Sequence, residues 1–487
     1  MPVPGREQVR LSLPASAKMS VLMTDLWRMG ALALAGAVSS GEASCEQVIG
    51  AHLRRIEAVN VSINAIAVVL GEQALDAARA ADRLLASGAP VPRLHGVPFT
   101  VKDNIDLAGT PTTQGARALS DAYPACDAPS VERLRAAGAI PIGRTNLPTF
   151  GMGWVCESEL WGGTVNPWDR SLTPGASSGG EAAALATGMS PLGLGNDGLG
   201  SLRWPAQCCG ISVLRTTRGR IPRATTVGQP DVPISVQLME VDGPMARRVA
   251  DLWAAFELLA GPSWRDPWTV PAPVRGPDPA KPVRIAVVTD PAGRGTAQQV
   301  QDGVRKAAGA LSEAGYAVEE IEPPSIDVAA KTALDMLAPD WQAASPFLSQ
   351  SMPANTSMVW AALLQVAGDP DRLTAMLSYM TRQSLLRAWG EFQETCPLIV
   401  APIFTDVPFG VGKGTTTAEV AEIIEGLRMA IAVNALGLPA VAVPVGVENG
   451  LPQAVQVVGP PYREDLCLDA AAALEARLGV ITPIDPR

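Results

Sequence analysis

The feature of this chain that most constrains its fold is an alternation of short apolar runs with alanine-rich helical stretches. The apolar runs lie at residues 97–101, 140–142 and 192–194 and are bounded by glycine, proline or asparagine. Between them, residues 130–137 and 181–187 have the composition of helices. Alternating strands and helices predict an α/β fold, in which a sheet is covered by helices on both faces.

The rest of the chain adds elements of both kinds. Repeated prolines between residues 261 and 282 disfavour regular helix or central strand, so this passage is predicted to connect elements across the surface. The other predicted elements are helices within residues 43–88 and at 296–312 and 464–477, and strands at 283–288, 316–321, 432–444 and 453–458.

Residues 326–395 are predicted to form a helical insertion rich in methionine, leucine and tryptophan. One interpretation is that the insertion shapes a substrate pocket, with Met352, Met358, Trp360 and Leu363 as candidate lining residues. The other is that its helices only pack in the core, since helical spacing of apolar residues is typical of core helices. The sequence alone leaves both interpretations open.

The length and composition of the chain favour one large folded unit. Of its 487 residues, 47% are hydrophobic and 18% charged, which is enough to bury a large core. Large α/β folds exceed the usual domain size, so we predict one domain over residues 41–487. Residues 1–40 are predicted to be an N-terminal arm and the start of the first helix. The arm lacks the apolar core of a secretory signal, and no stretch of the chain approaches the roughly 20 apolar residues that span a bilayer.

Net charge disfavours some classes of binding partner, and the cysteine pattern disfavours disulfides and a zinc site. The net charge of −10 disfavours binding to nucleic acid or to an anionic membrane surface. The seven cysteines are odd in number and form no C-x-x-C pair, which favours reduced thiols in a cytoplasmic protein over a disulfide framework or a zinc site. Neither a metal nor a cofactor is predicted.

Histidine is scarce in this chain. His52 lies on a predicted amphipathic helix and His95 at the start of a strand, and no G-x-S-x-G segment accompanies either residue. A Ser-His-Asp hydrolase is therefore a poor fit, and so is a histidine-rich metal site.

A lysine supplies an alternative base. Lys102 follows the apolar run at 97–101, so it is expected at a strand end, where α/β proteins commonly place active sites. Two tracts of small residues, PGASSGGEAAA at 174–184 and GNDGLGSLRWPA at 195–206, supply serines and closely approaching backbone N–H groups.

Several segments resemble those of the amidase signature family, in the same order. Residues 175–206 are similar to the signature itself: paired serines, paired glycines, an alanine-rich helix and then Asp-x-x-x-Ser-Leu-Arg-x-Pro. The other matching segments are LHGVPFTVKDNIDLAGTPTTQG around Lys102, GAIPIGRTNLPTFG at 138–151, NPWD at 166–169, DGPMARRVAD at 242–251 and GLPAVAVPVG at 437–446. The resemblance extends from about residue 40 to the C-terminus and implies the amidase signature fold, a large mixed β-sheet covered by helices on both faces.

Carried over residue by residue, the resemblance implies a Ser-cisSer-Lys triad. Ser201 would attack the substrate carbonyl, Ser177 would follow a cis peptide bond and relay the proton, and Lys102 would be the base. A lysine with its ordinary pKa of about 10.4 is almost wholly protonated at pH 7. Burial must therefore lower the pKa of Lys102, or the reaction must prefer alkaline conditions.

The resemblance also implies the surroundings of the triad. The backbone amides of Gly198, Leu199, Gly200 and Ser201 would form the oxyanion hole. Ser178 is expected to hydrogen-bond the relay serine or its neighbouring backbone, and Asp197 and Arg203 are expected to pair and hold the loop. Leu199 departs from the family pattern, which has glycine there, and is expected to reshape the acyl site with an apolar wall.

Tryptophan is unusually common, with 11 residues against four tyrosines. Trp154, Trp161 and Trp204 lie in or next to the matching segments and, with Leu199, are the candidate pocket residues. They favour a bulky apolar or aromatic substrate, although tryptophan also fills large cores.

Three functions fit these observations. The favoured one is hydrolysis of a carbon–nitrogen acyl bond in a small, apolar or aromatic amide, through an acyl-enzyme on Ser201. Hydrolysis of a carbamate (urethane) or an ester would use the same residues. The amidase subunit of a tRNA-dependent amidotransferase is a third alternative, disfavoured by Leu199 and by the tryptophan content. The predicted partner is a small-molecule substrate, and the resemblance adds a homodimer.

Overall fold

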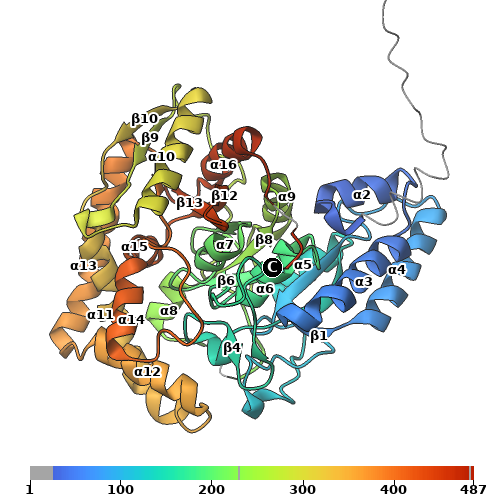
Figure 1. Ribbon diagram of the computed structural model, residues 1–487, viewed down its shortest axis with the longest axis horizontal. Helices are drawn as coiled ribbons and strands as arrows, with labels where there is room; N and C mark the ends of the chain where they lie inside the picture. The colour runs from blue at the N-terminus through green and yellow to red at the C-terminus, as the bar shows by residue number, and fades with distance from the viewer. Residues whose placement is uncertain (1–25, 229–230, 482–483, 487) are drawn as a thin grey trace, which may run out of the picture.

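The computed structural model describes residues 26–228, 231–481 and 484–486, and Figure 1 shows their arrangement. Residues 1–25 of the predicted arm lie outside the described residues. From residue 26 on, the segment packs on the folded body as a 3₁₀ turn (η1, Leu26–Arg28) and a helix (α2, Ala31–Ser39). The carboxylate of Asp251 accepts hydrogen bonds from the first two amides of α2, at 2.9 Å each, which satisfies donors that a helix start leaves without partners. Residues 26–39 therefore pack on the folded body, and α2 is a helix that starts before residue 40, as the sequence predicted.

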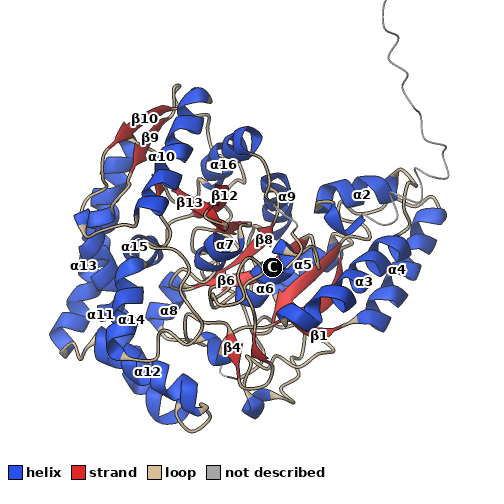
Figure 2. Ribbon diagram, viewed as in Figure 1, coloured by secondary structure: helices blue, strands red, loops and turns tan. Residues whose placement is uncertain are grey.

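One sheet of 11 strands runs through the molecule (Figure 2). In spatial order its strands are β1 (Ile66–Val69), β3 (Ile140–Thr145), β2 (Pro98–Lys102), β6 (Leu192–Asp197), β8 (Val241–Ala246), β7 (Ser212–Arg215), β12 (Ala440–Glu448), β13 (Leu451–Val458), β11 (Leu398–Ala401), β9 (Arg284–Val287) and β10 (Ala317–Glu320). Strand β2 pairs parallel with β3 and β6, and β9 pairs parallel with β10 and β11, while the other pairs are antiparallel. The predicted large mixed sheet is confirmed.

Helices cover the sheet, as Figure 2 shows. Every residue of β2 and of β6 is buried, as expected for strands that are covered on both faces. The helices not yet named are α3 (Cys45–Ile63), α4 (Gly71–Ala86), α5 (Pro129–Ala136), α6 (Gly179–Ala186), α7 (Arg203–Cys209), α8 (Ile234–Met239), α9 (Val249–Leu259), α10 (Gln298–Glu313), α11 (Ile326–Leu348), α12 (Ala354–Ala367), α13 (Arg372–Thr395), α14 (Thr417–Gly426), α15 (Arg428–Leu436) and α16 (Glu464–Leu478). Within the described ranges, no helix is both long and apolar enough to cross a bilayer.

The predicted insertion at 326–395 is helical, as α11, α12 and α13. By contrast, the predicted strand at 432–444 is wrong in its first part, because residues 432–436 belong to helix α15. Every residue of α15 is buried, so its sequence shows no polar face that would distinguish a helix from a buried strand. Gly437 ends the helix in the left-handed conformation, with φ 67°, and β12 begins three residues later.

Candidate active site

The parallel pairing of β2 with β6 brings the candidate residues together. Lys102 is the last residue of β2, and Asn196 and Asp197 are the last two residues of β6. Because the two strands run in the same direction, their carboxyl ends meet at one edge of the sheet. Ser177 precedes α6, and Ser201 lies in the loop between β6 and α7. The structure therefore places Lys102, Ser177 and Ser201 in one region.

Lys102 is fully buried and touches neutral oxygens. Its Nζ lies 2.7 Å from Ser177 Oγ and 2.7 Å from Asn196 Oδ1. Among the described residues, no carboxylate forms an ion pair with Lys102. Burial lowers the pKa of Lys102 from its ordinary value to about 8, against the opposing attraction of the Glu240 carboxylate. A base of this kind is partly neutral near neutral pH.

The two serines of the predicted triad line the same cavity. The peptide bond between Ala176 and Ser177 is cis, as the resemblance implied. The main-chain carbonyl of Ser201 accepts a hydrogen bond from the Ser178 N–H at 3.2 Å, which ties the two serine loops together. The prediction for the Ser178 side chain is wrong, because its Oγ donates to the Asn196 main-chain carbonyl at 3.4 Å and not to Ser177 or its neighbouring backbone.

The loop from Gly198 to Ser201 differs from the predicted oxyanion hole at one amide. The Gly200 N–H donates to Asp197 Oδ1 at 2.8 Å, so this amide already has a partner and is directed away from a substrate oxygen. The amides of Gly198, Leu199 and Ser201 remain candidates. Leu199 itself is accommodated without strain, because the left-handed conformation of this loop falls on Gly200, with φ 98°.

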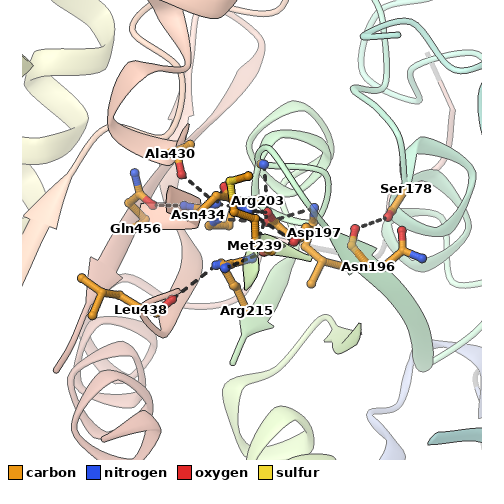
Figure 3. Close-up of polar contacts among 12 residues, drawn as sticks. Ser178, Asn196, Asp197, Arg203, Arg215, Met239, Ala430, Asn434, Leu438 and Gln456 are labelled. Carbon is orange, nitrogen blue, oxygen red and sulfur yellow. Dashed lines mark hydrogen bonds and ion pairs between the residues drawn. The ribbon is translucent and has the colours of Figure 1, made fainter. Parts of the chain in front are cut away.

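Behind this loop, Asp197 is the centre of a buried polar network (Figure 3). Its carboxylate accepts hydrogen bonds from Arg203 Nε at 3.0 Å and Asn434 Nδ2 at 2.8 Å, and Arg215 lies 3.5 Å away. Burial alone would raise the pKa of Asp197, but the charges of Arg203 and Arg215 overcome it and hold the pKa below its ordinary value. The expected Asp197–Arg203 pair is thus present, and it is fully buried rather than solvated.

Arg203 and Arg215 extend this network across the sheet. Arg203 donates to Gln456 Oε1 at 2.7 Å and to Asn434 Oδ1 at 2.5 Å, and Arg215 donates to the Asp197 and Met239 carbonyls at 2.6 and 2.9 Å. Figure 3 shows these contacts joining the loop after β6 to α15 and the strands beyond. The network anchors the loop that carries Ser201.

A cavity of about 210 Å³ opens in front of Ser177 and Ser201. This volume is below the roughly 300–1,000 Å³ of typical drug-sized sites, so the cavity suits a small ligand. Its apolar wall comes in part from the helical insertion, which supplies Leu337, Trp341, Trp360 and Leu363. Trp360 and Leu363 were candidates from the sequence, whereas Met352 and Met358 do not line this cavity and Met358 is half exposed.

Two of the four predicted pocket residues line the cavity, and two do not. Trp154 and Leu199 lie in its wall. Trp161 instead donates from Nε1 to Asp103 at 3.2 Å. Trp204 is buried in the core with its ring 4.5 Å from that of Phe404. The last two assignments are wrong because nearness to a motif in the sequence does not decide on which side of the backbone a side chain lies.

Several residues that line the cavity were not identified from the sequence. Asn104 and Asn196 flank the lysine, and Glu240 is the one carboxylate among the described lining residues. Both histidines, by contrast, have structural partners: His52 Nδ1 lies 2.9 Å from the Val48 carbonyl, and His95 Nε2 lies 3.0 Å from the Ala81 carbonyl. Asn104 and Asn196 lie within the matching segments, next to Asp103 and Asp197, and this position is the sequence signal that could have identified them.

Comparisons with known proteins agree with this geometry. The family model described as "Amidase" matches residues 47–468. The chain is 39% identical to an indoleacetamide hydrolase of Bradyrhizobium diazoefficiens, over 94% of this chain and 88% of that protein. It is 34% identical to a subunit of glutamyl-tRNA(Gln) amidotransferase from Salinispora arenicola, over 95% of this chain and 99% of that protein. Among solved structures, 6-aminohexanoate cyclic dimer hydrolase in complex with its substrate is 28% identical, with a TM-score of 0.79 over 93% of this chain and 98% of that one.

Proposed function

Since this chain belongs to the amidase signature family and is an amidase that hydrolyses carbon–nitrogen amide bonds, we propose that its substrate is a small, neutral amide with an aromatic ring, of the arylacetamide type. The observation that carries this proposal is the composition of the cavity. Trp154, Trp341 and Trp360 contribute to its wall, and Ser177 and Ser201 lie in the same cavity. The relatives named as indoleacetamide hydrolases support the same class of substrate.

The charge of the cavity supports a neutral substrate. Glu240 is its one carboxylate, and the described lining residues include no lysine or arginine. Glu240 pairs with Arg223 at 3.0 Å, but Arg223 also lies 3.6 Å from Asp242, so two carboxylates share one guanidinium. A second carboxylate brought in by a substrate would find no cation in the wall and would be repelled by Glu240.

The proposed mechanism uses the buried lysine in its neutral form. The Ser201 hydroxyl gives its proton to Ser177 Oγ while the Ser177 proton passes to the lone pair of Lys102 Nζ, and Ser201 Oγ attacks the amide carbon. The amides of Gly198, Leu199 and Ser201 would stabilise the negative oxygen. The relayed proton then leaves with the amine, and water releases the acid from Ser201 by the same relay.

The two alternative functions differ in how well they are supported. Carbamates and esters would form an acyl-enzyme through the same groups, so urethane or ester hydrolysis stays a proposal that substrate comparison decides. The amidotransferase alternative is less well supported, because indoleacetamide hydrolases are the more similar relatives and because glutamine, a zwitterion, is a poor match for an aromatic wall.

The test is a comparison of kcat/KM for indole-3-acetamide, phenylacetamide, acetamide, succinamate and glutamine, with an aryl carbamate and an aryl ester beside them. Burying an aromatic ring contributes about 1.5–3 kcal/mol, so the arylacetamides should exceed acetamide by about 10–100-fold. Succinamate should be the poorest amide because of its charge. A preference for glutamine or succinamate would contradict the proposal.

A pair of tryptophan variants sharpens this test. Trp360→Ala should remove most of the preference for arylacetamides while leaving the acetamide rate close to that of the wild type. Trp264→Ala is the matched control, because the Trp264 side chain is 91% exposed and does not line the cavity. Equal losses in the two variants would show that the tryptophan wall does not bind the ring.

The cellular location and the oligomeric state of the protein are also proposals. All seven cysteines are unpaired, which supports a reducing compartment such as the cytoplasm. The homodimer implied by the family resemblance would be checked by light scattering of the purified protein.

A further inference from the structure

The nitrogen of Lys102 has two close neighbours, and only one of them belongs to the predicted triad. Ser177 Oγ and Asn196 Oδ1 both lie 2.7 Å from Nζ. A neutral amine has two N–H bonds and one lone pair, and rotation about the Cε–Nζ bond exchanges them. To accept the proton of Ser177, Lys102 must direct its lone pair, and not an N–H bond, towards Ser177 Oγ. A second acceptor that holds an N–H bond would select that rotation.

Asn196 is placed to be this acceptor. Its side-chain amide lies between Lys102 and Asn104, and its Nδ2 donates to Asn104 Oδ1 at 3.0 Å. With the donor end of the amide engaged by Asn104, the carbonyl end faces Lys102 Nζ. The Asn196 main-chain carbonyl accepts a hydrogen bond from the Ser178 hydroxyl, as Figure 3 shows, so Asn196 contacts both Lys102 and the residue that follows Ser177.

We propose that Asn104 and Asn196 form a positioning pair, in which Asn196 Oδ1 holds an N–H bond of Lys102 so that the lone pair faces the Ser177 hydroxyl. The proposal rests on the proposed role of Lys102 as the base. No atom of either asparagine enters the reaction. The proton still passes from Ser177 Oγ to Nζ, and the ammonium that results keeps one N–H bond on Asn196 Oδ1 throughout.

The Asn196 side chain is a neutral amide, and its lack of charge matters as much as its position. A carboxylate at the same 2.7 Å would also accept an N–H bond, but its charge would hold Lys102 as an ammonium and remove the lone pair. An amide oxygen orients the nitrogen without fixing the extra proton on it. Asn104 fits the same logic, because it orients Asn196 without adding a charge to the buried site.

Two substitutions of similar size separate orientation from charge. Asn196→Leu removes the acceptor, and Asn196→Asp keeps an acceptor but adds a charge. The measurement is the pH dependence of kcat/KM for indole-3-acetamide, together with the pH dependence of the rate at which a fluorophosphonate labels Ser201, which requires no amide substrate. Circular dichroism and thermal unfolding establish that each variant is folded.

We expect Asn196→Leu to lower kcat/KM by about 10–100-fold at every pH, because misplacing a catalytic group by about 1 Å costs up to about 100-fold. The rising limb of its pH profile, where kcat/KM increases with pH, should not shift to higher pH. Asn196→Asp should move the rising limb up by about 1–3 pH units, since an adjacent opposite charge shifts a pKa by this amount. Above the new limb its rate should recover to within a few-fold of the wild type, because a carboxylate oxygen accepts the same N–H bond. Asn104→Ala should resemble a milder Asn196→Leu.

Several outcomes overturn the proposal. It is wrong if Asn196→Leu keeps the wild-type rate and profile, or if both Asn196 variants lose the same activity at every pH, which would indicate packing alone. If Asn196→Leu does not fold, the test depends on Asn196→Asp alone. The proposal is then wrong if the rising limb of the Asn196→Asp pH profile stays at the wild-type pH. If the wild type hydrolyses no arylacetamide but the labelling rates follow the expected pattern, the proposed substrate is wrong and the positioning pair stands.

Discussion

Two buried polar clusters include neighbouring residues of β6. In one cluster a basic side chain has neutral partners, and in the other a carboxylate is paired with arginines. Asn196 faces Lys102, whose close partners are an amide oxygen and a hydroxyl. Asp197, the next residue, faces Arg203 and Arg215. Successive side chains of a strand point to opposite faces, so the two clusters are separated by the strand itself. Burial lowers the pKa of Lys102 to about 8, whereas the arginines keep the pKa of Asp197 low despite its burial.

The difference shows that the end of β6 contributes both to a reactive lysine and to a rigid loop. A buried lysine without a carboxylate partner is poised to lose its proton, which is what a general base requires. A carboxylate between two arginines is locked in one charge state and, through its bond to the Gly200 N–H, fixes the loop that carries Ser201. In the proposed mechanism, the first cluster would carry out the proton transfer and the second would hold Ser201 in place.

Among changes to the two clusters, removing the lysine has the largest expected effect. Lys102→Met should lower kcat/KM for an arylacetamide by roughly 10⁴-fold, because it removes the general base from a group of residues that act together. Its thermal unfolding temperature should equal or exceed that of the wild type, since a costly buried amine is replaced by an apolar chain of similar length. Steady-state kinetics and calorimetry on the same preparation check both statements. A destabilised Lys102→Met would show that this cluster is structural too.

The second cluster should respond in the opposite way. Arg203→Met leaves the buried Asp197 with one arginine fewer and should cost about 3–5 kcal/mol of unfolding free energy. Urea unfolding measures this loss. If Arg203→Met is as stable as the wild type, the network does not anchor the loop.

A matched change at two asparagines compares the clusters directly. Asn434→Leu removes a partner of both Asp197 and Arg203 and should destabilise the protein by about 1–3 kcal/mol, the cost of leaving buried polar groups without a hydrogen bond. Asn196→Leu should change stability less and catalysis more. Urea unfolding gives the loss of unfolding free energy in each variant, and kinetics gives the loss of kcat/KM. If both variants lose similar amounts of stability and of activity, the two clusters do not differ in the way described.

The smallest effect is the response of the wild type to pH. With a pKa of about 8, Lys102 is about one-tenth neutral at pH 7 and about nine-tenths neutral at pH 9, so kcat/KM should rise about tenfold across this interval. The sign follows from the base role, because raising the pH removes the proton that blocks the lone pair. A rate that falls or stays constant between pH 7 and 9 would mean that neutral Lys102 is not required.

The sequence predicted the parts of the site that lie in continuous motifs. The family resemblance implied that Lys102, Ser177 and Ser201 lie in one site, and the structure brings them together, while their catalytic roles stay a prediction. The Asp197–Arg203 pair lies within one matched segment. The signature also implied the cis peptide bond before Ser177, which the structure contains. The mixed sheet could be predicted in the same way, since its buried strands alternate with helices along the chain.

The predictions that were wrong or missing concern features that depend on where side chains point in three dimensions. Trp204 lies next to the nucleophile loop in sequence, but its ring packs in the core, whereas Trp341 lies about 140 residues further on and lines the cavity. Residues 432–436 were predicted as strand because a fully buried helix and a buried strand share the same apolar composition. Asn196 was overlooked because its importance comes from a 2.7 Å contact with a residue on another strand.

The most direct test of the account is the release of ammonia from indole-3-acetamide at pH 9 by the wild type and by Ser201→Ala. We expect steady hydrolysis by the wild type and a loss of about 10⁵-fold or more in the variant, because the attacking oxygen is gone while the cavity and both clusters remain. A Ser201→Ala variant that keeps a tenth of the wild-type rate would place the nucleophile elsewhere and contradict the account.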